Sequence, residues 1–167
     1  GEIVINGKST KSMNKDELAV LRNKEIGFVF QFHYLLPEFT ALENILIPYR
    51  ISNGKASEEI VNRAEELMHF VGISEVKDNI VTNMSGGQQQ RTAIARALIN
   101  NPQIVLADEP TGNLDSESTE NVFETLKDIN SEYKTTFIVI THDRNIAQKG
   151  DRTIELKDGR VNMDIKK

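Results

Sequence analysis

The chain has 167 residues, a formal net charge of −5 and 38% hydrophobic residues, which suits one domain with a substantial core. Cysteine is absent, so disulfides and thiolate metal sites are excluded. The acidic charge argues against nucleic acid as the main partner, because binding to a phosphate backbone normally needs a basic face. No apolar run approaches the roughly 20 residues that span a bilayer, so we expect no direct membrane insertion.

The spacing of apolar residues predicts alternating strands and helices along the chain. In order, we expect a strand at 2–6, a helix at 15–23, a strand at 26–30, a short helix at 40–45, helices at 57–71 and 85–98, a strand at 104–107, a helix from 116, a strand at 137–140 and a hairpin at 153–161. The pairs Asn6-Gly7 and Asp158-Gly159 are typical of two-residue hairpin turns.

Several helices have recognisable ends. Thr40 and Glu43 have the spacing of a capping box, and Ser116 is expected to cap the helix that follows it. The clearest amphipathic helix is predicted at 57–71, and Gly72 follows its end.

The strands at 104–107 and 137–140 are apolar throughout and are separated by an amphipathic helix. This pattern predicts strands that are buried on both faces within a parallel α/β sheet. Ligands of such sheets bind at the carboxyl ends of the strands. The residues that follow these ends are Gln31, Asp108, Glu109 and His142.

The adjacent carboxylates Asp108 and Glu109 are the first candidates for a site. One carboxylate at a strand end can hold Mg²⁺, directly or through water, and its neighbour can polarise the water that attacks a γ-phosphate. The alternative is an ordinary solvated acidic loop. The motif at 111–115 behind the pair and the glycine pair ahead of it favour the functional interpretation.

Ser85-Gly86-Gly87-Gln88 precedes a predicted helix, and a helix N-terminus attracts phosphate. A simple N-cap explains the serine well. It explains the paired glycines poorly, because glycine costs backbone entropy unless close approach or unusual dihedral angles require it.

Gly7-Lys8-Ser9-Thr10 imitates the end of a phosphate loop, G-x-x-x-x-G-K-[ST]. The position of the first glycine is occupied by Glu2, and the β-branched residues 3–5 suit a strand rather than a nest of amides. We therefore expect a β-turn here. His33 has no second His or Cys at ligand spacing, so we expect a packing or partner contact rather than a metal ligand.

Together these motifs resemble the ATP-binding cassette (ABC) ATPases. Residues 84–88 resemble the signature motif of the family, 104–110 its Walker B strand, and Thr141-His142-Asp143 its switch-histidine segment. The stretch 30–44 is most similar to the ATP-binding subunit of the bacterial lipoprotein-releasing system, and 107–115 is shared with macrolide-export and cell-division relatives. The resemblance implies an α/β fold with a P-loop NTPase-like (RecA-like) parallel sheet and an ABC α-helical subdomain, N-terminally truncated.

The resemblance also implies ligands and roles. ATP and Mg²⁺ would be bound, and catalysis would rest on Glu109 and His142. The nucleotide-binding residues would be Ser85, Gly86, Gly87, Gln88, Gln31 and Asp115, and the metal would meet Gln31 and Asp108. Without the resemblance, His142 would be interpreted as a structural histidine and Gln31 as a surface glutamine.

Residues 1–31 and 102–167 would form the core part, and about 32–101 the helical subdomain with the signature motif. Two copies would sandwich ATP as a homodimer and drive transmembrane permease subunits from the cytoplasmic face of the inner membrane. Since the chain starts at Gly1 and has no phosphate loop, we expect a piece of a longer protein that binds ATP weakly and hydrolyses it negligibly, with an exposed strand edge at 137–140. A non-transport ABC ATPase and a non-enzymatic module remain alternatives.

Overall fold

The computed structural model describes the backbone of residues 1–167 and the side chains of all of them except Ser116 and Glu117. The α-helices are α1 (Lys15–Glu25), α2 (Ala41–Asn53), α3 (Glu58–Phe70), α4 (Gly86–Leu98), α5 (Ser116–Tyr133) and α6 (Arg144–Lys149). The strands are β1 (Val4–Ile5), β2 (Lys8–Ser9), β3 (Ile26–Phe30), β4 (Ile104–Asp108), β5 (Thr136–Ile140), β6 (Arg152–Lys157) and β7 (Arg160–Lys166). Short 3₁₀ turns lie at Thr10–Ser12, Ser74–Val76 and Val81–Asn83.

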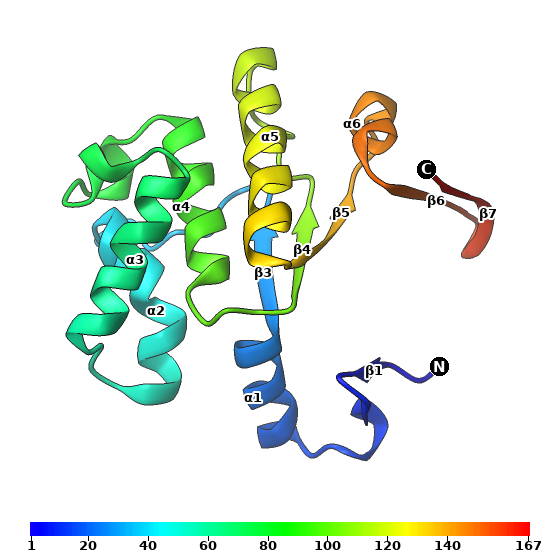
Figure 1. Cartoon of the computed structure of the whole chain (residues 1–167), viewed down its shortest axis with the longest axis horizontal. Coiled ribbons are helices and arrows are strands. Elements are labelled where there is room, and N and C mark those ends of the chain that lie inside the picture. The colour runs from blue at the N-terminus through cyan, green and yellow to red at the C-terminus, as the bar shows by residue number, and fades with distance from the viewer.

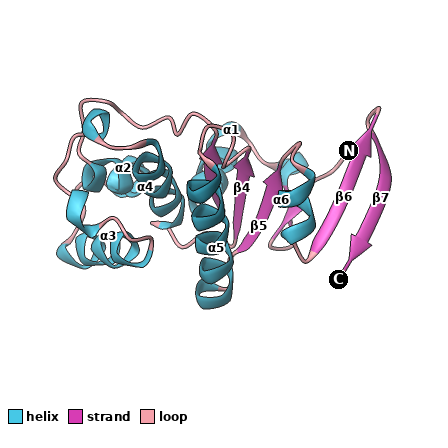
Figure 2. Ribbon diagram, turned by 90° about the horizontal axis from the view of Figure 1, so that it is seen from above, coloured by secondary structure: helices cyan, strands magenta, loops and turns pink.

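The elements form an elongated molecule. Helices α2, α3 and α4 gather at one end, the sheet of β3, β4 and β5 lies in the middle beside α5, and the β6–β7 hairpin stands at the other end (Figures 1 and 2). Both termini lie at the hairpin end.

The central sheet has the strand order β3-β4-β5, and both pairings are parallel. Val29 is in register with Ala107, which is in register with Val139. The expected parallel α/β arrangement is therefore confirmed, and β5 lies at the sheet edge as expected.

The two faces of this sheet are buried to different extents. Val29, Val105 and Ala107 have no exposed surface, whereas Ile138 and Ile140 on the opposite face are 49% and 51% exposed. The expectation that the apolar strands are buried on both faces is thus wrong for the described chain. Side chains alternate between faces, and α4 and α5 cover only one of them.

The core runs without a break from the covered sheet face into the helical end. It joins the sheet residues to the buried face of α5 and to residues of α2, α3 and α4. The strand–helix contact is closest at Gly27, where a Cβ atom would lie 2.5 Å from the carbonyl oxygen of Ala97. A glycine is therefore needed for β3 to approach α4 this closely.

The turn predictions hold. Asn6 and Gly7 have φ values of 51° and 74°, and Asp158 and Gly159 have 51° and 73°, as two-residue turns with left-handed residues require. The segment that imitates a phosphate loop therefore forms the β1–β2 hairpin and the 3₁₀ turn after it.

Two helix boundaries differ from expectation. Helix α2 begins at Ala41 with the predicted Thr40–Glu43 capping box, but it continues through Pro48 to Asn53, because Ile45 and Leu46 pack in the core. The expected cap, Ser116, has a side chain outside the described residues, and the N-cap of α5 is Asp115, whose side chain accepts from the Ser118 N–H.

Among the helices that the structure describes, none combines the length and the apolar character that a membrane span requires.

Candidate functional site

The sequence-predicted residues meet at the carboxyl edge of the central sheet. Phe30, Asp108 and Ile140 are in register across the strands, so the residues that follow them leave the sheet at the same edge. These residues are Gln31, Glu109 and Thr141. Such an edge is where parallel α/β sheets bind ligands.

The Glu109 side chain contacts the loop after β5. Its Oε1 accepts from the backbone N–H of His142 at 2.8 Å and lies 2.7 Å from the Nδ1 of the His142 imidazole. Its Oε2 accepts from the Thr141 hydroxyl at 3.2 Å. The carboxylate is 19% exposed and the imidazole 88% exposed. The carboxylate is therefore held inside the edge, while the imidazole faces solvent.

These contacts set the charges of the pair. Partial burial acts to raise the pKa of Glu109, but hydrogen bonds from the side chain and backbone of His142 and from Thr141 outweigh it, and the pKa lies below its usual 4.5. The hydrogen bond to Glu109 and the charge of that carboxylate raise the pKa of His142 above its usual 6.5. The pair favours an ionised carboxylate beside a protonated imidazole.

The backbone of Glu109 is also unusual. Its φ of +43° lies in the left-handed region, which costs a non-glycine residue of order 1–3 kcal/mol. The backbone N–H of Glu109 donates to the Ile140 carbonyl at 2.9 Å, and its own carbonyl accepts from Gly112 at 3.0 Å. The surrounding backbone therefore fixes the turn that aims this carboxylate.

Gln31 lies over the loop that follows Glu109. Its side-chain amide donates to Oδ1 of Asn113 at 3.4 Å, and the Asn113 amide donates back to the Gln31 carbonyl at 3.2 Å. A Cβ atom on Gly112 would approach the Gln31 amide nitrogen to 2.8 Å. Glycine at this position thus makes room for the glutamine side chain.

The donor set at this edge fits a magnesium ion. Asp108 is exposed at the end of β4, and Gln31 follows Phe30, the register partner of Asp108. Carboxylate and amide oxygens are ligands that Mg²⁺ accepts, and this ion usually keeps waters and substrate phosphates as its other ligands. No group of three or more His, Cys, Asp or Glu residues placed to hold a metal occurs within the described part of the chain.

The predicted phosphate-binding run begins α4. Ser85 is its N-cap: the hydroxyl accepts from the Gln88 N–H at 3.3 Å, and the Gln88 side chain accepts from the Ser85 N–H at 2.9 Å. The capping explanation for Ser85 is therefore correct for this chain. Packing does not require the glycines, because a Cβ on Gly86 would stay 3.8 Å from Leu114 and one on Gly87 would stay 3.5 Å from Ser118.

Asp115, at the end of the loop that follows Glu109, forms hydrogen bonds with the first turn of α5. Its carboxylate accepts from the Ser118 N–H at 2.8 Å and from the Ser118 hydroxyl at 3.0 Å. Because Ser118 also neighbours Gly87, the tip of α4 and the loop that runs from Glu109 to Asp115 lie side by side.

Sequence reasoning missed several supporting residues. Gln90, which is fully buried on α4, donates to the Pro110 carbonyl at 2.6 Å, and its Oε1 has no partner among the described atoms. Asn113, Thr141 and Arg96 also hold the site loops. The signal available for Gln90 was a polar residue on the apolar face of a helix.

His33 is half-buried in the loop after β3. Burial lowers the pKa of His33 the most, a hydrogen bond with Gln89 opposes this, and the charge of Arg96 lowers it further. The residue lines a small hollow of about 120 Å³ with Phe32 and Gln89 among its neighbours.

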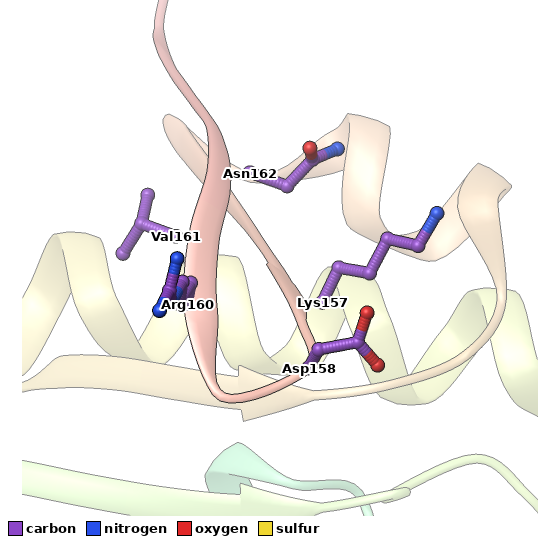
Figure 3. Close-up of a pocket in the computed structure, with 5 residues that line it drawn as sticks. All are labelled: Lys157, Asp158, Arg160, Val161 and Asn162. Atoms are coloured by element: carbon purple, nitrogen blue, oxygen red, sulfur yellow. The ribbon is translucent and has the colours of Figure 1, made fainter.

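One hollow on the surface lies away from the predicted site. It has a volume of about 470 Å³ and lies at the turn between β6 and β7. Figure 3 shows Lys157 and Asp158 on one side of the hairpin and Arg160 and Val161 on the other, so these side chains do not converge on a ligand. We therefore place the candidate site at the sheet edge.

The glutamate, the exposed acid and the glutamine lie at the carboxyl edge of a parallel sheet, beside a serine-glycine helix start, which is the edge where α/β proteins bind ligands. The chain belongs to the ABC transporter family, whose sequence model matches residues 1–112.

Relatives in two bacteria support this assignment. The lipoprotein-releasing system ATP-binding protein LolD 1 of Rhodopseudomonas palustris is 47% identical over 161 residues, covering 96% of this chain and 71% of that protein. LolD of Anaeromyxobacter dehalogenans is 46% identical over 164 residues, covering 98% of this chain and 69% of that protein.

Solved structures confirm the fold class. The dimeric, post-hydrolysis ATP-binding cassette MJ0796, bound to ADP and Pi, matches with a TM-score of 0.86 and 44% identity over 99% of this chain and 73% of that chain. CbiO1 of Clostridium perfringens, part of the ABC transporter complex cbiONQ, matches with a TM-score of 0.85 and 27% identity, covering 96% of this chain and 64% of that chain.

Proposed function

We propose that this chain is part of an ATP-hydrolysing subunit of a bacterial ABC transporter of the lipoprotein-releasing type. The observation that carries the proposal is the convergence of Gln31, Asp108, Glu109 and His142 at one sheet edge, with Glu109 and His142 2.7 Å apart. The similarity to two LolD proteins supports the lipoprotein branch.

Glu109 is the proposed base that orients the attacking water. A carboxylate with a lowered pKa stays ionised at neutral pH, and the hydrogen bonds from His142 and Thr141 fix its direction. Positioning of this kind supplies much of the catalysis of phosphoryl transfer.

His142 is the proposed sensor of the γ-phosphate. Its raised pKa favours the imidazolium, and its exposure leaves the ring accessible to an anionic group. The Mg²⁺ ion would be held by Asp108 and Gln31, and it would neutralise charge on the β- and γ-phosphates.

The dimer proposal rests on the glycine pair. Glycine in a helix costs about 1 kcal/mol relative to alanine, yet the chain itself leaves room for a Cβ at Gly86 and Gly87. Close approach by a group outside the chain accounts for both. We propose that this group is the triphosphate bound by a second copy, which the start of α4 meets with its amides, and that Asp115 couples the two sites.

The partner would be a pair of transmembrane permease subunits at the cytoplasmic face of the inner membrane. They would dock near Gln31 and the helical segment from Leu42 to Val71, which contains most of α2 and all of α3. The proposed division into a core (1–31 and 102–167) and a helical subdomain (about 32–101) follows this arrangement.

Glu109→Gln in the full-length protein tests the catalytic assignment. The amide is nearly isosteric but lacks the charge needed to orient water, so turnover should fall by at least about 100-fold while ATP-dependent pairing of subunits persists. Steady-state ATPase rates and size-exclusion chromatography with ATP measure the two effects. Unchanged turnover would refute the base.

A second candidate concerns the 167 residues by themselves. Because Gly7–Thr10 form a hairpin and a turn, they supply no phosphate-binding nest, and the chain alone would act as a partner-binding module with negligible turnover. An ATPase assay on this chain and on a version extended upstream separates the cases. Activity in the short form would contradict the second candidate.

A further inference from the structure

The loop that leaves β3 contains an unusual pair of residues. His33 and Tyr34 have φ values of 60° and 48°, so two consecutive non-glycine residues occupy the left-handed region. The Tyr34 N–H donates to the Phe32 carbonyl at 2.6 Å, which closes a three-residue turn. Such backbone is costly and persists only where its surroundings fix it.

Arg96 on α4 supplies that fixation. One terminal nitrogen donates to the Tyr34 carbonyl and the other to the His33 carbonyl, both at 2.6 Å. A planar guanidinium can direct two donors at adjacent carbonyls in this way, whereas a lysine ammonium lacks the fork. Burial lowers the pKa of Arg96, and no ion pair with a carboxylate joins it among the side chains that the structure describes.

Gln31 depends on this turn for its position. Its own hydrogen bonds with Asn113 are long, at 3.4 Å and 3.2 Å. The hydrogen bonds that Arg96 donates to the carbonyls of His33 and Tyr34, two and three residues after Gln31, are short. The loop runs from the end of β3 toward the helical end of the molecule (Figure 1). The turn therefore restrains the backbone from which the Gln31 side chain extends.

We propose that Arg96 is a positioning residue that clamps the His33–Tyr34 turn to α4 and thereby sets Gln31 at the nucleotide site. Helix α4 begins at the Ser85 cap, eleven residues and roughly 16 Å before Arg96, so the clamp joins the loop of Gln31 to the helix that carries the signature run. The role in turnover rests on the proposed function, whereas the clamp itself does not.

The chain offers a matched control. Arg63 on α3 donates to the carbonyls of Leu98 and Ile99 at 3.1 Å and 3.0 Å, so it also spans two adjacent carbonyls with one guanidinium. Both of its targets belong to the end of α4, and neither belongs to the Gln31 loop. Loss of Arg63 should affect packing between helices without moving the site.

The experiment compares Arg96→Lys, Arg96→Met and Arg63→Lys in the full-length protein. Hydrogen exchange of peptides that cover residues 31–36 reports the turn, and kcat and KM for ATP report the site. Both Arg96 variants should exchange at least about tenfold faster in this segment and lose at least about tenfold in kcat. Arg63→Lys should change neither, and thermal melting of all three shows whether loss of global stability is comparable.

Equal exchange at 31–36 in all three variants would overturn the clamp. Faster exchange with unchanged kcat would overturn the positioning role of Arg96 but keep the clamp. If the wild-type protein hydrolyses no ATP, the proposed function fails, while the exchange measurement still decides the clamp.

Discussion

Glu109 combines a left-handed backbone with a carboxylate held by two residues of the next strand's loop. The contact with His142 lies mostly at the surface, because the imidazole is exposed, so it contributes little to global stability. Its value is local. It keeps the carboxylate ionised and holds it against the loop after β5.

The charge pair has a defined pH window. The lowered pKa of Glu109 makes its contribution present above pH 4.5 and lost as the pH falls through the lowered value. The raised pKa of His142 makes its contribution fully present below pH 6.5 and lost as the pH rises through the raised value. The ion pair is therefore fully formed between about pH 4.5 and 6.5.

A titration of the His142 ring tests this pair. In the wild-type chain the midpoint followed by NMR should lie above 6.5, and in Glu109→Gln it should move down toward 6.5, because the neighbouring charge is lost. An unchanged His142 midpoint would show that Glu109 does not stabilise the imidazolium.

At the scale of elements, α4 is the link between the parts of the site. Its first residues form the serine-glycine run, Gln90 reaches the Pro110 carbonyl, and Arg96 reaches the loop after β3. This many contacts require α4 to lie close against β3, which the glycine at position 27 permits.

Gly27→Ala tests that close approach. The added Cβ would lie 2.5 Å from the Ala97 carbonyl oxygen and 2.9 Å from Val105, so strand and helix must separate. We expect the free energy of unfolding to fall by at least about 1–3 kcal/mol in a urea titration.

Gly150→Ala is the control for this change. Its φ is −72°, and the nearest atom to an added Cβ lies 3.5 Å away, so alanine fits there without displacing a neighbour. Stability should stay unchanged or rise by up to about 1 kcal/mol, because alanine restricts the unfolded chain. Equal losses at both positions would mean that contact with Ala97 is not the cause.

At the scale of the whole molecule, the apolar surface is unevenly covered. One face of the central sheet and much of the β6–β7 hairpin remain open, with exposed Ile138, Ile140, Ile154 and Leu156. Strand β5 also forms the edge of its sheet. An open edge beside exposed isoleucines favours pairing with another chain.

We therefore expect the 167-residue chain to self-associate as its concentration rises. The double variant Ile138→Lys/Ile140→Lys should shift sedimentation profiles toward the monomer, since charge on this face opposes stacking. Ile51→Lys is the control, because Ile51 is 74% exposed at the end of α2, away from the sheet. The same distribution for the double variant and the wild type would contradict this expectation.

Local sequence was sufficient where local chemistry decides the outcome. The Asn6-Gly7 turn, the Thr40 and Ser85 caps and the apolar strands were predictable, because each depends on dihedral preferences or hydrogen bonds within a few residues. The convergence at the sheet edge was also predictable, since parallel strands place their carboxyl ends together.

Tertiary structure decided what depends on residues far apart in the chain. Which face of the sheet is covered, how far α2 extends past Pro48, and which partners Gln90 and Arg96 hold are set by packing between elements. Sequence by itself determined the elements and the chemistry offered at their ends. Only the fold determined how tightly that chemistry is held, because hydrogen bonds to distant carbonyls leave no periodic trace in the sequence.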